Sequence, residues 1–287
     1  MHPRSCVAGP GISVLEQPNE LRHQSAVSRA TIAVIVAIFS SLFLLFILAP
    51  VAGLVAAGAP RGLAGFAEDH ELQASLLLTA WTATAATVLG VLGATPLAYF
   101  LARRAFPGRA IVSALLDLPL VIPHPVAGIA LLLVLGRGSP VGSALYAAGL
   151  RVASSPTGIV CAMLFVSAPL YVSAARETFE RVDARYESVA RTLGDDPWRA
   201  FRRVTLPLSA RGLTAAGVVM WARAVSEFGA IVILTYNPKV ASVLSYDRFT
   251  SFGLSEALPV AAVLVLFSLV PLAALRALRP GSSRFIR

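Results

Sequence analysis

The chain has 287 residues, of which 56% are hydrophobic and 14% are charged, and its formal net charge is +9. This composition excludes an ordinary water-soluble protein and is typical of an integral membrane protein. The sequence has no His, Cys and carboxylate cluster with metal-ligand spacing and no GxSxG or HExxH motif, so we expect neither a metal site nor a catalytic residue.

The predicted elements begin with a polar segment, residues 1–29. It shows no apolar period and contains Pro, Ser, Gln and Asn, so we expect it to be disordered. Residues 30–278 form the predicted membrane domain, and a short tail, residues 279–287, follows. Six apolar runs are long enough to cross a bilayer, which takes about 20 helical residues. They lie at residues 30–57, 74–101, 110–135, 156–175, 212–235 and 256–277. The first run is too long for a signal peptide.

Arginine residues are distributed unequally over the predicted loops. If the N-terminus is cytoplasmic, the inner segments carry most of the arginines. The outer loops then carry only Arg61, Arg137, Arg151, Lys239 and Arg248. The positive-inside rule therefore predicts that both termini and the loop of residues 177–211 are cytoplasmic. A basic face beside anionic lipid headgroups explains the net charge, and no nucleic-acid partner is needed.

The third apolar run contains three prolines around one histidine. Pro119, Pro123 and Pro125 cannot all lie in an undisturbed helix, because each removes a backbone hydrogen bond and crowds the preceding turn. Irregular backbone at membrane depth persists only where protein or water satisfies it. We expect this run to kink or unwind beside a translocation path. His124 either packs between helices or lines that path.

The predicted inner loop, residues 177–211, contains a polar stretch, residues 187–207, that is typical of a helix–turn–helix. Its first helix is expected to end near Gly194, because glycine adopts the left-handed conformation without a Cβ clash. Glu187 and Arg191 are spaced i, i+4 on that helix and are expected to form a favourable pair.

The second helix of the stretch has its own start signals. Asp195 or Asp196 can cap it, and Pro197 suits its first turn, where a missing N–H costs nothing. Trp198 and Phe201 give this short helix an apolar edge among several arginines. We therefore expect an aromatic edge that docks onto another protein; the alternative is an ordinary amphipathic helix at the membrane surface.

The fifth apolar run contains Arg223 and Glu227 at i, i+4 spacing, followed by Phe228. Charges inside a membrane are costly, so the two side chains should face each other, a cavity or a helix interface. A guanidinium group suits an oxyanion because it is planar and always charged, although Glu227 would neutralise much of its attraction. A structural ion pair and direct anion contact both remain open. With Pro123, His124 and Pro125, these residues form the candidate path or gate.

Lys239 is the only lysine of the chain, and it is followed by valine. A phosphate-binding GxxxxGK[ST] loop is therefore excluded. If ATP drives this protein, the ATPase is another chain.

Residues 187–207 resemble the cytoplasmic signature loop of the permease subunits of ABC importers. In that pattern two small residues precede a glycine, and the loop ends in Leu-Pro. The matching residues are Val189, Ala190, Gly194, Leu206 and Pro207. Ser188 stands where glutamate is common, and Glu187 can supply the acid one position earlier. The resemblance implies a coupling helix that lies in a groove of the ATPase subunit, with Trp198 and Phe201 as its apolar knobs.

Three further stretches resemble sulfate- and molybdate-type permeases, and most closely the archaeal-type molybdate/tungstate permeases. They are DLPLVIPHPVAGIALL at 117–132, WARAVSEFGA at 221–230 and YDRFTSFGLSEALPVA at 246–261. The resemblance implies a homodimer in the cytoplasmic membrane of a prokaryote, with the path on the dimer axis. It also implies two ATPase subunits that bind ATP and Mg, and an extracytoplasmic oxyanion-binding protein.

We therefore predict an all-α integral membrane protein with six transmembrane helices and the type I permease fold of ABC importers. Its expected function is ATP-driven import of a tetrahedral oxyanion, molybdate or tungstate, by alternating access. A sulfate/thiosulfate permease of the same class is one alternative. The other is a secondary transporter driven by an ion gradient, which would need internal repeats and buried carboxylates. We find no repeat, and only Glu227 and Asp117 are candidate carboxylates.

Overall fold

The computed structural model describes residues 18–277, and within that range all regular structure is helical, which confirms the predicted all-α class. The helices are α1 (Pro18–Ala64), α2 (His70–Arg103), α3 (Arg109–Val121), α4 (His124–Leu135), α5 (Pro140–Ala147), α6 (Pro156–Arg181), α7 (Ala184–Thr192), α8 (Pro197–Ala200), the π-helix η1 (Phe201–Thr205), α9 (Leu206–Val225), α10 (Gly229–Leu234), α11 (Ala241–Phe252) and α12 (Leu254–Ala277).

The chain divides into two compact units, residues 1–53 and residues 54–287. The described part of the first unit is the long N-terminal part of α1. That helix begins at Pro18, so the expectation of disorder is wrong for the residues from Pro18 to Arg29. The rest of the predicted N-terminal segment, residues 1–17, and the predicted tail, residues 279–287, lie outside the described residues.

Among the described residues, four helices are long and apolar enough to cross a membrane. They are Ile32–Ala64, His70–Arg103, Pro156–Arg181 and Leu254–Pro271. They correspond to the first, second, fourth and sixth predicted spans. A fifth candidate is the pair α3 and α4, which together pass the same test but meet at a bend of 112°. The predicted count of six is therefore not reproduced as six continuous helices.

The bend between α3 and α4 lies at the predicted proline cluster. Ile122 is extended, with ψ 131°, as expected for a residue that precedes a proline, and Pro123 precedes the first residue of α4. The expected interruption of the third span is confirmed, and it is a sharp break.

The fifth predicted span, residues 212–235, is also divided, and its prediction as one helix is wrong. Helix α9 ends at Val225, and α10 begins at Gly229 after a short irregular stretch. A local reason is that the Glu227 carboxylate, one residue before the N-cap Phe228, accepts a hydrogen bond from the backbone N–H of Ala230 in the first turn of α10 at 2.9 Å. The same side chain thus starts a new helix where continuous helix was expected.

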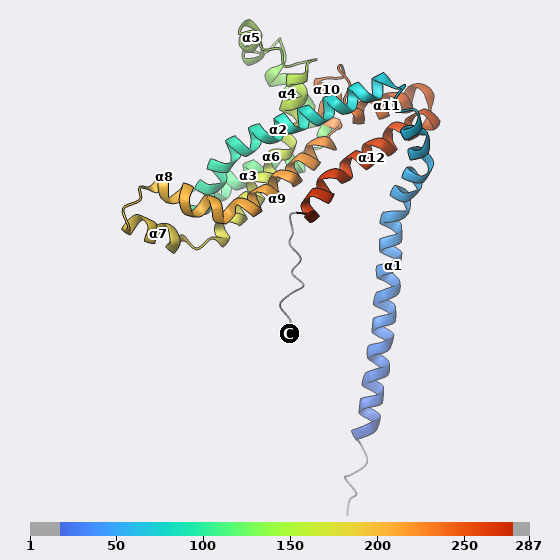
Figure 1. Cartoon of the computed structure of the whole chain (residues 1–287), viewed down its shortest axis with the longest axis vertical. Helices are drawn as coiled ribbons and strands as arrows, with labels where there is room; N and C mark the ends of the chain where they lie inside the picture. The colour runs from blue at the N-terminus through green and yellow to red at the C-terminus, as the bar shows by residue number, and fades with distance from the viewer. Residues whose placement is uncertain (1–17, 278–287) are drawn as a thin grey trace, which may run out of the picture. The chain divides into compact units, whose positions relative to one another are not determined.

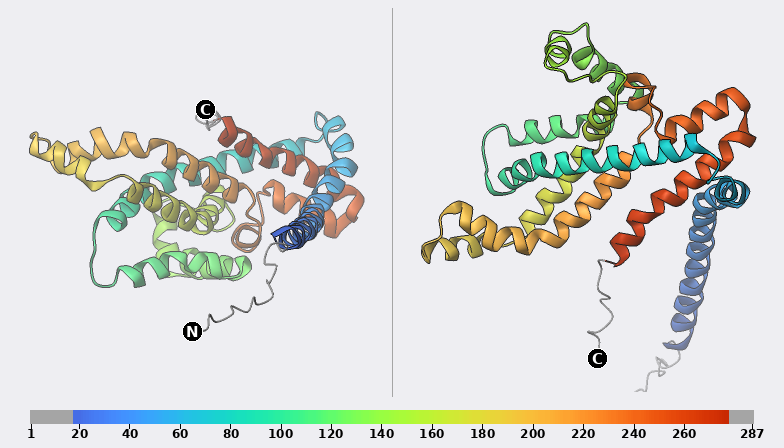
Figure 2. Two further views of the ribbon diagram at one scale, coloured as in Figure 1. Left: turned by 90° about the horizontal axis from the view of Figure 1, so that it is seen from below. Right: turned by 45° about the horizontal axis from the view of Figure 1, so that its top comes forward.

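Helices α2, α6 and α9 run side by side and form the core of the second unit (Figures 1 and 2). Small residues on α2, such as Ala83, Ala86 and Ala98, are fully buried and allow the backbones to approach closely. A Cβ atom at Gly90 would lie only 2.1 Å from the Met220 side chain on α9. This packing fixes the ends of the three helices, where the candidate functional residues lie.

Candidate coupling segment and helix-break cluster

The stretch from Glu187 to Pro207, which we call the coupling segment, forms the predicted helix–turn–helix at one end of the second unit (Figure 1). Helix α7 ends at Thr192, and Gly194 follows with φ +101°, a conformation that favours glycine. Asp196 caps α8 by accepting a hydrogen bond from the N–H of Arg199 at 2.9 Å. Pro197 occupies the first position of that helix, as expected.

The two predicted aromatic knobs have different environments. Trp198 is 64% exposed as a residue, and its ring stacks on Phe201 with the centroids 5.6 Å apart. Phe201 itself packs inward against Tyr99 of α2, with centroids 4.6 Å apart, and against Phe179 of α6. Trp198 is therefore the exposed ring of the two, and the expectation that Phe201 also protrudes is wrong.

The remaining residues of the segment position it on the membrane helices. Ala190 is buried, Leu206 packs partly buried against the core at the start of α9, and Pro207 follows as an exposed residue in the first turn of that helix. Asp195 pairs with Arg203 at 3.0 Å. The segment that carries the exposed indole thus also carries the Asp195–Arg203 and Asp196–Arg199 ion pairs, and charged groups of this kind are typical of the rim of an interface.

Glu187 does not pair with Arg191, and the predicted i, i+4 pair is wrong. Its carboxylate accepts hydrogen bonds from the Tyr99 hydroxyl at 2.8 Å, from Nε of Arg103 at 2.9 Å and from the Thr205 hydroxyl at 2.6 Å. Burial alone would raise the pKa of the Glu187 carboxyl, but the bonds from Thr205 and Tyr99 and the charge of Arg103 outweigh it, so the pKa is lowered. The side chain joins the coupling segment to α2.

A second cluster joins the two broken spans. A terminal nitrogen (Nη2) of Arg223 lies 2.6 Å from Nε2 of His124 and 2.9 Å from a carboxylate oxygen of Glu227. Because a guanidinium only donates, the His124 Nε2 must accept, which places the ring proton on Nδ1. The side chain of Glu227 is only 1% exposed, whereas that of Arg223 is 21% exposed. The predicted ion pair is present, and it also binds the histidine at the first position of α4.

Helices α4 and α10 approach closely around this cluster. A Cβ atom at Gly229 would lie 2.7 Å from the Cβ of His124, and one at Gly128 would lie 2.7 Å from the carbonyl oxygen of Ala230. The break after α9 is also held by Ser242, whose hydroxyl donates to the Glu227 carbonyl at 2.8 Å. The cluster therefore fixes both breaks relative to each other.

The remaining candidate gate residues surround this joint. Pro123 and Pro125 are exposed, whereas Phe228 is partly buried and packs against Tyr246 with the ring centroids 5.0 Å apart. In this conformation three side chains bind the Arg223 guanidinium: His124, Glu227 and the Ser226 hydroxyl, which accepts a hydrogen bond at 3.2 Å. Its contact with a transported anion remains a prediction.

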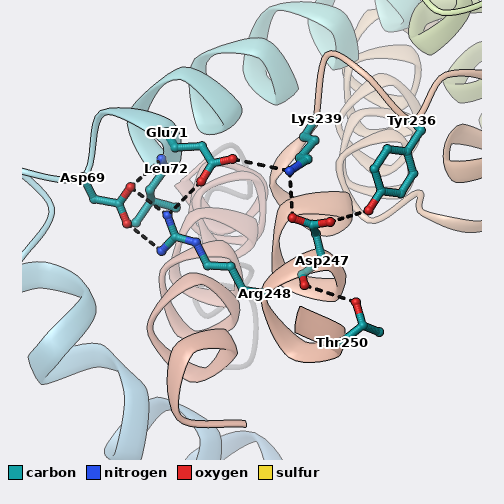
Figure 3. A network of polar contacts seen from close by, with 8 residues as sticks. All are labelled: Asp69, Glu71, Leu72, Tyr236, Lys239, Asp247, Arg248 and Thr250. Carbon is teal, nitrogen blue, oxygen red and sulfur yellow. Dashed lines mark hydrogen bonds and ion pairs between the residues drawn. The ribbon is translucent and has the colours of Figure 1, made fainter. Parts of the chain in front are cut away.

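A polar network lies at the opposite end of α2 from the coupling segment (Figure 3). Arg248 of α11 binds both carboxylate oxygens of Asp69, at 2.7 and 2.8 Å. Lys239 binds Asp247 at 2.7 Å and Glu71 at 3.6 Å. The acidic residues Asp69 and Glu71 at the start of α2 are therefore part of an ion-pair network. Because three carboxylates surround two cations, the network does not attract an oxyanion.

Replacing Arg248 with alanine is expected to lower the free energy of unfolding by about 1–2 kcal/mol, because Asp69 loses two charge-assisted hydrogen bonds in a partly exposed site. The bonds from Arg248 lower the pKa of Asp69, so this contribution is present above the usual aspartate pKa, about 4, and is lost as the pH falls through the lowered value. Thermal unfolding in detergent at several pH values measures it. A difference that persists unchanged in acid would contradict the assignment, and Arg61→Ala is the exposed control.

Two arginines of the segment around α5 share one aromatic ring. The guanidinium carbon of Arg137 lies 3.7 Å from the centroid of the Tyr146 ring, and that of Arg151 lies 5.7 Å from it. Both arginines are exposed, neither has an acidic partner among the described residues, and they line a cavity of about 240 Å³. Sequence reasoning placed them only as outer-loop charges. The two arginines come together through the tertiary structure around α5, which the spacing of residues in the sequence does not predict.

Comparisons with known proteins agree on one class of membrane protein. The family described as binding-protein-dependent transport system inner membrane component matches residues 94–284. The molybdate/tungstate transport system permease protein WtpB of Thermococcus kodakarensis is 44% identical over 188 residues, which is 66% of this chain and 71% of that protein. A probable molybdenum ABC transporter permease protein of Haloferax volcanii is 37% identical over 228 residues, 79% of this chain and 83% of that one.

Solved structures show the same fold. A bacterial ABC transporter involved in the import of the acidic polysaccharide alginate contains a chain with a TM-score of 0.69 and 16% identity, covering 90% of this chain and all of that one. A chain of the methionine ABC transporter MetNI, in an inward-facing conformation, has a TM-score of 0.57 and 15% identity, covering 73% of this chain and 96% of that one. These similarities confirm the predicted fold class.

Proposed function

The chain belongs to the family of binding-protein-dependent transport system inner membrane components, and from that premise we propose that it is the permease subunit of an ATP-driven importer of molybdate or tungstate. The observation that carries the proposal is the coupling segment, which presents Trp198 at the end where the positive-inside rule places the cytoplasm. The relatives named for molybdate and tungstate support the cargo.

The energy for transport enters from other chains. This sequence has no phosphate-binding loop, so ATP and Mg bind to a separate ATPase subunit, and this chain contributes no catalytic residue. ATP binding and hydrolysis change the affinity of the partners for the inward- and outward-facing states, which is the source of the switch. The permease alternates access in a cytoplasmic membrane with both termini inside.

A second copy of the chain completes the path. Helices α3 and α4 expose many apolar side chains, among them Leu115, Val121, Ile129 and Leu133. In a membrane protein such a surface is covered either by lipid or by another subunit. A homodimer would cover this surface with a second copy of the chain. It would also bring the path to the dimer axis, because the helix-break cluster begins at the first residue of α4.

An extracytoplasmic binding protein delivers the anion, and we place its contact at Arg137, Tyr146 and Arg151. Two exposed cations on one tyrosine ring form a surface that suits an acidic partner, since Tyr and Arg are enriched at binding hot spots. The network around Arg248 is unsuited to this role, because its cations are already paired.

Reversing both charges, Arg137→Glu with Arg151→Glu, is expected to slow association of the binding protein by about tenfold at low salt, because opposite charge steers the encounter. Surface-based binding kinetics with the purified transporter in nanodiscs measures the rate at several salt concentrations. Arg61→Glu, another exposed outer arginine, is the control and should associate normally. An unchanged rate and salt dependence in the double variant would place the contact elsewhere.

The cargo is tested by competition. Vesicles containing the permease, its ATPase and its binding protein take up labelled molybdate, and unlabelled tungstate or sulfate is added in molar excess. We expect tungstate to compete and sulfate to leave molybdate uptake unchanged. Competition by sulfate and not by tungstate would favour the sulfate/thiosulfate alternative.

A further inference from the structure

The coupling segment is attached to a helix to which the chain does not connect it directly. Along the sequence it lies between α6 and α9, but its main polar contacts are with α2. The side chains of Arg103 and Glu187 are only 13% and 16% exposed, so their ion pair, at 2.9 Å, is shielded from solvent. Shielded, hydrogen-bonded ion pairs are stronger and more rigid than exposed ones.

An aromatic contact follows the same route. The exposed ring of Trp198 stacks on Phe201, and Phe201 packs against Tyr99, whose hydroxyl donates to Glu187. Thr205, which also donates to Glu187, is fully buried at the end of the π-helix η1. A displacement of Trp198 is therefore transmitted to α2, because the groups between them are in close contact and can be compressed very little.

Helix α2 then connects two distant polar networks. It has 34 residues, which corresponds to about 50 Å at 1.5 Å per residue. The Glu187 contacts hold its C-terminal end, and Asp69, which caps its N-terminal end, is bound by Arg248 of α11. Coupling between distant sites is carried by such contiguous networks and rigid elements.

Resting on the proposed function, we infer that Tyr99 and Arg103 are positioning residues that clamp the coupling segment to α2, so that α2 moves with the segment and carries the motion of the ATPase to the outer network around Arg248. The clamp is a joint between the docking site and the membrane domain. It takes no part in docking itself, because its groups are largely shielded from solvent and Tyr99 lies against the inner side of Phe201.

The test separates the clamp from docking and from simple stability. The variants are Tyr99→Phe, which removes one hydroxyl, and Arg103→Gln, with Arg103→Lys as the conservative variant. Arg104→Gln is the matched control, because Arg104 is the next residue, is exposed and has no ion-pair partner among the described residues. For each variant in vesicles, we measure copurification of the ATPase, ATP hydrolysis and ATP-driven molybdate uptake per assembled complex.

We expect Tyr99→Phe combined with Arg103→Gln to assemble with the ATPase and hydrolyse ATP, but to lower uptake per ATP hydrolysed by about tenfold. Arg103→Lys should keep a higher uptake per ATP hydrolysed than Arg103→Gln. Arg104→Gln should have the same uptake per ATP as the unchanged protein. If the double variant does not fold, Tyr99→Phe alone must still lower the ratio. Unchanged uptake per ATP in the folded variants overturns the inference. Failure of the unchanged protein to copurify with the ATPase overturns the proposed function instead.

Discussion

Replacing Trp198 with aspartate is expected to abolish recruitment of the ATPase subunit and to leave membrane insertion intact. Trp198 is 64% exposed, and its indole is the one aromatic ring of the coupling segment that faces outward. Truncating such an anchor at an interface costs about 2 kcal/mol or more, a loss of about thirtyfold or more in affinity, and a carboxylate in an apolar groove adds a desolvation cost. Copurification of the ATPase with the permease measures the effect.

Three companion variants show why recruitment is lost. Trp198→Phe keeps an apolar ring and should retain most of the binding. Gly194→Val should also weaken recruitment, because φ is +101° and nothing lies within 4 Å of its Cβ position, so only backbone strain changes. Gly194→Asn should be milder, since asparagine tolerates a positive φ. Normal copurification of the ATPase with Trp198→Asp would contradict the docking role.

Replacing Arg223 with alanine is expected to destabilise the protein by about 3–5 kcal/mol, because it leaves the Glu227 carboxylate buried without its cation. His124 loses its hydrogen bond from Arg223 at the same time, so both helix breaks are released. Thermal unfolding in detergent and the yield of folded protein measure the loss.

The double variant Arg223→Met with Glu227→Gln separates the two open roles of the pair. It removes both charges and keeps an amide oxygen that can cap α10, so stability should largely return. If the pair is only structural, anion uptake returns with stability. If Arg223 contacts the anion, the stable double variant remains inactive. Full stability of the single variant Arg223→Ala would contradict the buried ion pair itself.

The features that sequence predicts here are those determined by neighbouring residues. Gly194 ends its helix and Pro123 breaks the third span because each acts on its own backbone. The partner of Glu187 could not be predicted in this way. Spacing offered Arg191, but the fold brings Arg103, 84 positions away in the sequence, into a shielded site where its ion pair is stronger.

The division of the fifth span shows the same limit. Arg223 and Glu227 were predicted on one helix, and their spacing does bring them together at 2.9 Å. The helix nevertheless ends at Val225, because the Glu227 carboxylate binds the N–H of Ala230 in the first turn of α10 and Ser242 of α11 holds the backbone of the break. These tertiary partners are not visible in the local pattern of apolar residues, which continues without interruption through the break.

We propose that this chain carries an oxyanion with energy that enters through the coupling segment from a separate ATPase. The most direct measurement is molybdate uptake into vesicles containing the permease, with the ATPase, its ATP and the binding protein each added or omitted. We expect uptake only when all three are present, and no uptake by the Trp198→Asp permease in the complete mixture. Uptake driven by a proton gradient without the ATPase would contradict it.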